Sequence, residues 1–265
     1  MLTPSRFVSR AGAAVRACVE AWQAGGTAEL RRVVREALYW RFHPRVRRWA
    51  AELPREERLD LEFDRRFGTD TAGEVPLEAV GIEGSEIERG HGRYRPVWTH
   101  VFRESLDRLG IDYRAYTFVD YGSGKGKALL LASDYPFAEI VGVEFARPLH
   151  EAAVRNIEKY SSQTQRCTRL RSECADATAF DPPPTPLVCF FFNPFDEGTT
   201  SVVLDRLRRS FDDNHRPIYV IYTNMRDVRE HEGIFKGHPG LSPVAEGPRY
   251  LALRFKNVPA RPAPF

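Results

Sequence analysis

The sequence contains few cysteines, and none of them has the spacing of a metal site. Four cysteines occur among 265 residues, at positions 18, 167, 174 and 189, and no two of them form a CxxC pair. Separate thiols of this kind are typical of a cytosolic protein that keeps its cysteines reduced. We therefore expect a cytoplasmic protein that uses no metal.

Long apolar runs are also missing. No stretch approaches the roughly 18 apolar residues that a membrane-spanning helix needs, and the N-terminus lacks the apolar core of a secretory signal. We therefore expect no membrane partner. The content of 42% hydrophobic and 28% charged residues is typical of an ordinary globular protein.

A large excess of charge of one sign is missing as well. The 39 Lys and Arg residues oppose 36 Asp and Glu residues, which gives a net charge of only +3. Residues 1–60 hold 12 Arg against 7 acids, a net charge of +5, and this fits a solvated helical face better than a nucleic-acid surface. Charge therefore argues against nucleic acid as a partner.

The N-terminal part of the chain shows helical periodicity and then a loop-rich stretch. Apolar residues repeat at intervals of three and four through residues 5–50, which predicts helices. Residues 60–95 are rich in glycine and charge, and they predict long loops with short elements. A helix is expected over 96–109. The expected domains are a helical N-terminal extension with a lid region (1–95), a main domain (96–257) and a proline-rich tail (258–265).

From residue 116 onward, strand and helix patterns alternate, which predicts a parallel sheet with helices on both faces. The last two strand-like runs, "LSPVAEG" and "RYLALRF", are too close together for a crossover helix and must form an antiparallel hairpin. The predicted fold is α/β, with a doubly wound, seven-stranded, mostly parallel sheet that ends in this hairpin. The expected strands lie near 116–120, 139–143, 168–172, 187–192 and 216–221, and the expected helices at 126–133, 148–160 and 198–210.

The stretch "FVDYGSGKGKALLLAS", Phe118 to Ser133, joins a strand pattern to a helix pattern through three glycines. A phosphate-binding P-loop requires G-x-x-x-x-G-K-[ST], but Ala128 stands at the last position. The dinucleotide fingerprint G-x-G-x-x-G requires a third glycine, where Lys127 stands. The pattern is instead D-x-G-x-G-x-G, beginning at Asp120. Lys125 and Lys127 are most simply exposed residues at the helix start.

The acid before the glycines indicates a cationic ligand. Asp120 would repel a pyrophosphate, but it would attract the ammonium group of S-adenosylmethionine (SAM), which also carries a sulfonium and no phosphate. The loop glycines let the backbone approach a ligand closely and turn sharply into the helix, whose first N–H groups can receive the ligand's carboxylate. The loop residues expected to bind are Gly122, Ser123, Gly124 and Gly126.

Two further acids follow the next two strands. Glu144 ends "EIVGVE", 18 residues after Gly126, where a carboxylate can accept hydrogen bonds from both ribose hydroxyls. Asp176, in "ECADATAF", is placed to reach an adenine amino group. Both acids are therefore candidate cofactor-binding residues.

The fourth strand delivers a polar turn to the same edge of the sheet. "PLVCFFFNPFDE" ends in Asn193, Pro194, Phe195 and Asp196, the candidate catalytic residues, and ligands of open α/β sheets bind at the carboxyl ends of the strands. The Asn193 side-chain oxygen and nearby backbone carbonyls could hold the N–H groups of an amine, with Phe195 packed beside them. A hydroxyl acceptor would need a general base, for which the chain offers His91, Asp196, Glu197 and His231.

Together these motifs resemble class I SAM-dependent methyltransferases over roughly residues 116–256. The resemblance implies that the glycine loop holds the methionine part of SAM, that Glu144 holds the ribose and that Asp176 holds the adenine. The final hairpin is this family's departure from the plain dinucleotide-binding fold. The resemblance implies methyl transfer from SAM to a small metabolite or a protein side chain.

Local similarity favours nitrogen over oxygen as the acceptor atom. "FVDYGSGKGKALLLAS" followed by "FFFNPF" is similar to the non-SET, Dot-type lysine methyltransferases. "NPF" is also similar to the NPPY-type segment of amino-methylating enzymes, although one proline is missing and Phe replaces Tyr.

Residues outside these motifs complete the expected site. Tyr94, in "GRYRP", is expected to cover the cofactor, and Asp70, in "GTDT", to face the acceptor. Tyr222 and Asn224, in "YTN", end the fifth strand and are expected to contact the substrate.

Two other classes of protein stay open. An NAD(P)-dependent oxidoreductase would share the α/β fold, but the missing third fingerprint glycine and the terminal hairpin count against it. A non-catalytic SAM-binding or scaffold protein, whose basic N-terminal region docks a partner, would also keep an intact glycine loop.

Overall fold

The computed structural model describes residues 44–84 and 92–257, with six isolated positions before residue 44. The chain forms two compact units, Met1–Leu53 and Pro54–Phe265. Helix α2 (Pro44–Phe67) begins in the first unit and ends in the second. The glycine loop and all the elements that follow α2 belong to the second unit.

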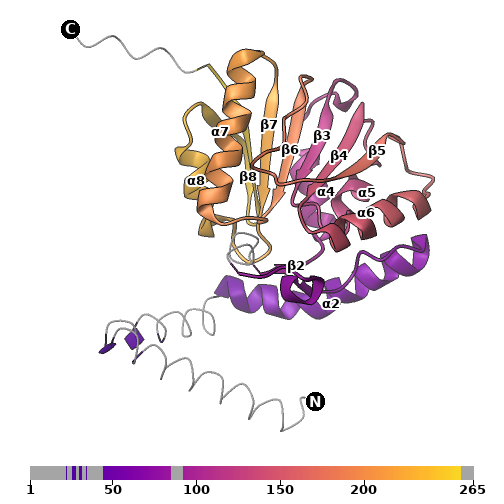
Figure 1. Ribbon diagram of the computed structural model, residues 1–265, viewed down its shortest axis with the longest axis vertical. Helices are drawn as coiled ribbons and strands as arrows, with labels where there is room; N and C mark the ends of the chain where they lie inside the picture. Colours follow the sequence, from indigo (N-terminus) through magenta and orange to yellow (C-terminus); the bar gives the residue numbers. More distant parts are fainter. Residues whose placement is uncertain are drawn as a thin grey trace. The chain divides into compact units, whose positions relative to one another are not determined.

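A seven-stranded sheet forms the centre of the second unit (Figure 1). The strand order is β5-β4-β3-β6-β7-β9-β8, in which β9 runs antiparallel to both β7 and β8 and the other pairs are parallel. This arrangement confirms the predicted sheet with its terminal hairpin and is the class I methyltransferase fold. The strands are β3 (Thr117–Tyr121), β4 (Glu139–Glu144), β5 (Leu170–Cys174), β6 (Leu187–Phe192), β7 (Ile218–Thr223), β8 (Leu241–Gly247) and β9 (Tyr250–Phe255).

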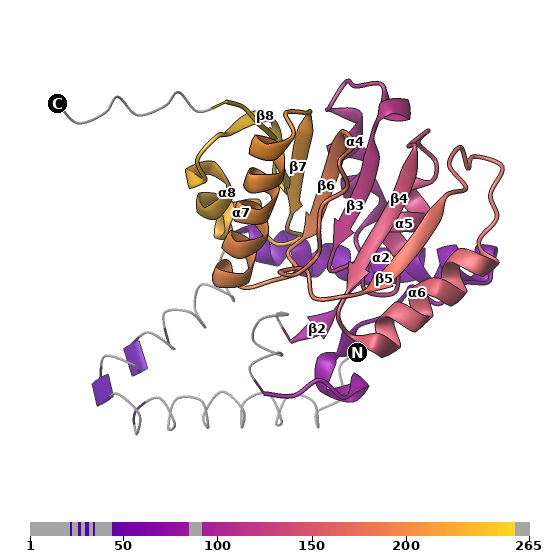
Figure 2. The ribbon, with the colours of Figure 1, turned by 45° about the horizontal axis from the view of Figure 1, so that its top comes forward.

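Helices cover both faces of this sheet, as Figures 1 and 2 show. One face carries α4 (Thr99–Asp107), α5 (Lys127–Ala132) and α6 (Arg147–Lys159), and the other carries α7 (Glu197–Asp213) and α8 (Glu232–Gly237). The smaller elements are the strand pair β1 (Val75–Pro76) and β2 (Arg93–Tyr94) and the short helices η1 (Leu77–Val80), η2 (Tyr113–Ala115) and η3 (Val228–Glu230).

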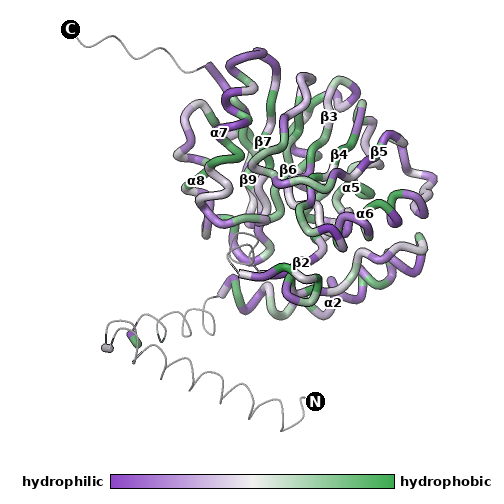
Figure 3. Tube along the Cα trace, in the orientation of Figure 1, coloured by the Kyte–Doolittle hydropathy of each residue, from purple (hydrophilic) through white to green (hydrophobic). Residues whose placement is uncertain are grey.

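Alternation along β3 decides which side chains face which helix layer. Val119 belongs to the apolar cluster that includes Leu204 of α7, while the Phe118 ring meets the ring of Phe102 in α4. Successive strand residues point to opposite faces, so Asp120 shares the α4 side with Phe118. The central strands are largely hydrophobic along their length (Figure 3), and the Asp120 carboxyl is therefore an exception in a buried strand.

Each strand and helix that the sequence predicts in the main domain lies within about three residues of its observed place, but the sequence misses α8 and the end of α2. Residues 60–67 were expected to be loop, and they are helix. Three acids of α2, Glu56, Asp60 and Asp64, recur every four residues and therefore lie on one helix face, where Glu56 and Asp60 are buried and Asp64 is half-buried. Phe63 and Phe67 of the same segment pack on Tyr160, but acids occupy the neighbouring inward positions, so hydrophobic periodicity does not reveal the helix end.

The acidic face of α2 explains a second wrong expectation, that Lys127 is exposed. The Lys127 ammonium forms a buried ion pair with Asp60, and the two side chains are only 2% and 6% exposed. Burial raises the pKa of the Asp60 carboxyl, against the lowering effect of the Lys127 ammonium. The first residue of α5 is thus joined to α2 by a buried ion pair. Removal of either side chain would leave the other charge buried without a partner.

Replacing Lys127 with methionine would leave the Asp60 carboxylate buried without its cation. We expect the free energy of unfolding in urea to fall by about 3–5 kcal/mol. Lys125→Met is the matched control, because Lys125 pairs with an Asp70 carboxylate that is 70% exposed, and its loss should cost about 1 kcal/mol or less. Equal stability of the two variants would contradict a buried Asp60–Lys127 pair.

Candidate functional site

The candidate site lies where the strand order of the sheet reverses, between β3 and β6. In open α/β sheets, ligands bind at the carboxyl ends of the strands by this switch point. The glycine loop follows β3, Glu144 ends β4, and Asn193 follows β6. Three of the predicted segments therefore meet at one edge of the sheet.

Asp120 holds a buried carboxyl group that lacks a full set of partners. Its residue is 3% exposed, and within the described part of the chain its Oδ1 atom has no hydrogen-bond partner. Burial, followed by the nearby charge of Glu144, raises the pKa of Asp120 well above its ordinary value. A cation placed against this oxygen would relieve the penalty of a buried, under-bonded carboxylate.

Glu144 joins the end of β4 to the glycine loop. Its Oε2 accepts the Gly124 N–H at 2.8 Å, and its Oε1 accepts the Ala146 N–H at 2.8 Å. Burial raises the pKa of Glu144 to about 6, although these backbone hydrogen bonds oppose the shift. An ionised carboxylate offers about four acceptor positions, so the two oxygens retain capacity for ligand hydroxyls.

Two loop glycines are required by the close approach of other elements. A Cβ atom on Gly122 would lie 2.5 Å from the Pro194 Cβ, and one on Gly126 would lie 3.1 Å from the Ala153 Cβ. Both glycines also have a positive φ, +80° and +83°, a conformation that other residues rarely adopt. Protein side chains thus lie against the Cβ positions of these two glycines, and Pro194 packs directly on the loop.

The middle glycine of the loop, Gly124, lies under the ring of Tyr94. A Cβ atom on Gly124 would be 2.2 Å from the nearest carbon of that ring. The buried Tyr94 hydroxyl donates to the Thr71 carbonyl at 2.6 Å, and the Lys125 ammonium lies 5.7 Å from the ring centroid. Tyr94 therefore rests on the glycine loop, where a residue that covers a cofactor would be needed.

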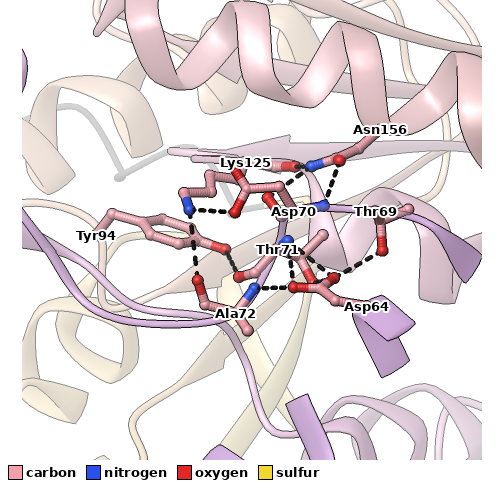
Figure 4. A network of polar contacts seen from close by, with 8 residues as sticks. All are labelled: Asp64, Thr69, Asp70, Thr71, Ala72, Tyr94, Lys125 and Asn156. Carbon is pink, nitrogen blue, oxygen red and sulfur yellow. Dashed lines mark hydrogen bonds and ion pairs between the residues drawn. The ribbon is translucent and has the colours of Figure 1, made fainter. Parts of the chain in front are cut away.

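Asp70 lies beside the glycine loop within a network of polar contacts (Figure 4). Its carboxylate pairs with the Lys125 ammonium at 2.8 Å and is 70% exposed. Its backbone N–H and carbonyl both bond to the side-chain amide of Asn156, at 2.7 and 2.9 Å. The described contacts of Asp70 are thus with the cofactor loop and α6, and its expected contact with the acceptor stays a prediction.

On the acceptor side, a chain of hydrogen bonds orients Asn193. Asn224 Oδ1 accepts the Arg226 N–H at 3.0 Å, and Asn224 Nδ2 donates to the Tyr222 hydroxyl at 3.3 Å. The Tyr222 hydroxyl donates in turn to Asn193 Oδ1 at 2.8 Å. Tyr222 and Asn224 are each 2% exposed. Asn193 itself has a φ of +43°, which is rare for a residue other than glycine.

The other candidate catalytic residues have clear structural contacts. Phe195 is buried in the core cluster against α7. Asp196 is the N-cap of α7, and its carboxylate accepts the Thr199 N–H at 2.7 Å. His231 Nδ1 lies 3.7 Å from a Glu197 oxygen. His91 lies outside the described residues.

Two expected cofactor residues differ in exposure. Ser123 is buried, and its hydroxyl has no hydrogen-bond partner within the described segments and lies next to Gly142 of β4. Asp176 is exposed, and its Oδ1 accepts the N–H and hydroxyl of Thr178 at 2.8 and 2.7 Å. Asp176 thus closes a turn after β5, and its role toward adenine stays a prediction.

Sequence reasoning missed Asn156 and the carboxylate of Asp64. Asn156 continues the buried stripe of α6 formed by Leu149, Ala152 and Ala153, so a polar residue at an apolar helical position was the available signal. Asp64 accepts hydrogen bonds from four groups of the segment that follows α2, the Thr69 and Thr71 hydroxyls and the Thr71 and Ala72 N–H groups. No local sequence motif predicts this turn after α2.

No family model matches this chain, and no curated protein matches it. The solved structures with a similar fold include the following three. The mitomycin 7-O-methyltransferase MmcR is 17% identical, with 60% of this chain and 55% of that chain covered and a TM-score of 0.42. The 23S rRNA methyltransferase ErmE is 13% identical over 62% of this chain and 70% of that chain, with a TM-score of 0.44. An RNA methyltransferase from Salinibacter ruber in complex with S-adenosyl-L-homocysteine is 15% identical over 63% of this chain and 97% of that chain, with a TM-score of 0.41.

These likenesses are too distant to assign an activity, and the match to MmcR spans little more than half of that protein. The class of fold rests on the strand order described above. Among the described residues, no helix is long and apolar enough to cross a membrane. The same residues contain no group of three His, Cys, Asp or Glu side chains that could hold a metal.

The contact between Gly124 and Tyr94 predicts a specific effect of adding one methyl group. Gly124→Ala should lose about 1 kcal/mol of stability from its positive φ and about 1–3 kcal/mol more from the clash with the Tyr94 ring. Gly110→Ala is the matched control, because Gly110 has a φ of +61° with no atom within 4 Å of its Cβ position. Urea unfolding checks both, and a similar loss in the two variants would contradict the contact.

Proposed function

We propose that this protein is a SAM-dependent methyltransferase whose cofactor site is the glycine loop and the ends of β3 and β4. One observation carries the proposal, namely the buried Asp120 carboxyl with its raised pKa and its unpartnered Oδ1. A site for pyrophosphate would not place an acid there, whereas the ammonium group of SAM would supply the missing partner. The class I methyltransferase strand order supports the same function.

The residues at the edge of the sheet suit the other parts of SAM. Glu144 retains acceptor positions for the two ribose hydroxyls, and Asp176 follows β5 with an exposed carboxylate. Tyr94 would cover the bound molecule from its position on Gly124. When bound, SAM supplies an activated methyl group, so the protein has mainly to align an acceptor with it.

The acceptor side favours nitrogen over oxygen. The Tyr222 hydroxyl uses one of the two lone pairs of Asn193 Oδ1, and the second can accept an N–H from an amine. A hydroxyl acceptor would need a base; of the described candidates, the Asp196 carboxylate caps α7, and His231 Nδ1 lies 3.7 Å from a Glu197 oxygen. Asn193 would therefore hold and orient an amine on a small metabolite or a protein side chain.

The rival classes account for less of the site. An NAD(P)-dependent oxidoreductase would bring a pyrophosphate toward Asp120, and it would not explain the antiparallel β9 beside β7. A non-catalytic SAM-binding protein would explain Asp120. SAM binding alone would give no reason for the strained backbone of Asn193, which lies beside the loop.

Calorimetric titration with SAM, S-adenosylhomocysteine and NADH tests the cofactor. We expect SAM to bind and NADH not to bind, and Asp120→Asn to weaken SAM binding about 10- to 100-fold, because a charged hydrogen bond is lost. Burial raises the pKa of Asp120 well above its ordinary value, and an ammonium group against it would favour the ionised form. SAM affinity should therefore rise with pH below the raised pKa of the free protein, with release of a proton on binding, and Asp120→Asn should weaken this dependence. Tight NADH binding without SAM binding would reject the proposal.

Asn193→Gly tests the acceptor role without strain, because glycine keeps the positive φ. On an acceptor found by screening amines, hydroxyl compounds and peptides with labelled SAM, kcat should fall about 10- to 100-fold. The Kd for SAM should stay close to that of the wild type. Full activity of this variant would show that Asn193 does not hold the acceptor.

A further inference from the structure

We propose that Asn156 is a positioning residue of the cofactor site, because it fastens the lid segment (residues 64–72) to the glycine loop. This inference rests on the proposed SAM binding and adds a residue that lies outside the predicted motifs. Asn156 belongs to α6 and is 2% exposed. It reaches the site only through main-chain groups of the lid segment and the loop.

The side-chain amide of Asn156 joins two segments that are far apart in the sequence. Its Nδ2 donates to the Lys125 carbonyl at 2.8 Å and to the Asp70 carbonyl at 2.9 Å. Its Oδ1 accepts the Asp70 N–H at 2.7 Å. One amide thus bonds both main-chain groups of a lid residue and the main chain of the glycine loop (Figure 4).

The contacts continue from the lid segment back to the same loop. Asp64 accepts the N–H groups of Thr71 and Ala72, at 2.8 and 2.6 Å, and so fixes the turn after α2. The next contact is from the Tyr94 hydroxyl to the Thr71 carbonyl at 2.6 Å. The Tyr94 ring then lies on Gly124, one residue before Lys125. A closed circuit of contacts therefore holds Tyr94 against the loop.

Asn156 is the strongest connection in this circuit. In the parallel ion pair, the Lys125 side chain is 12% exposed but the Asp70 carboxylate is 70% exposed, so solvent screens the pair and reduces its contribution. Loss of the buried Asn156 amide would instead leave three main-chain polar groups without a partner. The position of Tyr94 over the glycine loop thus depends chiefly on Asn156.

Two substitutions separate the amide's chemistry from its volume. Asn156→Ala removes all three hydrogen bonds, and Asn156→Asp keeps the shape but turns an oxygen toward the Lys125 and Asp70 carbonyls. We expect each variant to bind SAM at least about tenfold more weakly in calorimetric titration. We also expect faster hydrogen–deuterium exchange of residues 64–72 in the ligand-free protein.

Arg216→Met is the matched control for general destabilisation. Arg216 is 7% exposed and also clamps main-chain carbonyls, those of Pro183, Thr185, Ser210 and Asn214, but it precedes β7 at the opposite edge of the sheet. Its loss should lower Tm and leave SAM affinity and exchange of the lid segment unchanged. If Asn156→Ala does not fold, Tyr94→Phe breaks the circuit at Thr71 and should also weaken SAM binding and speed exchange of the lid segment.

The outcomes distinguish this inference from the proposed function. Wild-type protein that binds no SAM would reject the function, and unchanged exchange of residues 64–72 in the Asn156 variants would then reject the fastening role as well. If the wild type binds SAM and both Asn156 variants bind it within about twofold of the wild type, Asn156 does not position the cofactor site, whatever the exchange shows.

Discussion

The proposed site depends on one buried carboxyl group, that of Asp120, whose Oδ1 has no hydrogen-bond partner among the described residues. Strand β3 has five buried residues, and Asp120 is its acid, placed on the α4 side by the alternation of the strand. The nearby Glu144 is another buried acid, so it cannot compensate an ionised Asp120, and it helps to raise the pKa of Asp120. Under the proposed function, the ammonium group of the ligand supplies the positive charge that an ionised Asp120 lacks.

Three neighbouring segments pack on the glycine loop that follows Asp120. Pro194 contacts Gly122 from the β6 side, Tyr94 covers Gly124 from the lid side, and Ala153 of α6 meets Gly126. Each glycine thus accommodates one neighbour, and the loop cannot move without disturbing all three. Under the proposed function, cofactor binding and acceptor placement would share this loop, because Asn193 immediately precedes Pro194, which packs on Gly122.

Much of the fold followed from local patterns, since buried strands and amphipathic helices carry their periodicity in the sequence. The end of α2 did not, because its inward face mixes the acids Asp60 and Asp64 with the apolar Phe63 and Phe67. The segments that meet at the site were predictable, because the ends of parallel strands share an edge. The contacts of Lys127 and Asn156 were not, because each joins residues more than 30 positions apart without a local signature.

The most direct test of the account compares S-adenosylhomocysteine with its analogue that lacks the α-amino group, titrated against the wild type and Asp120→Asn. Both ligands share the adenosine and thioether parts, so the comparison isolates the ammonium. The account predicts that the wild type binds the analogue about 10- to 100-fold more weakly, and that Asp120→Asn discriminates little between the two. Equal affinity of the wild type for both ligands would contradict the assignment of Asp120.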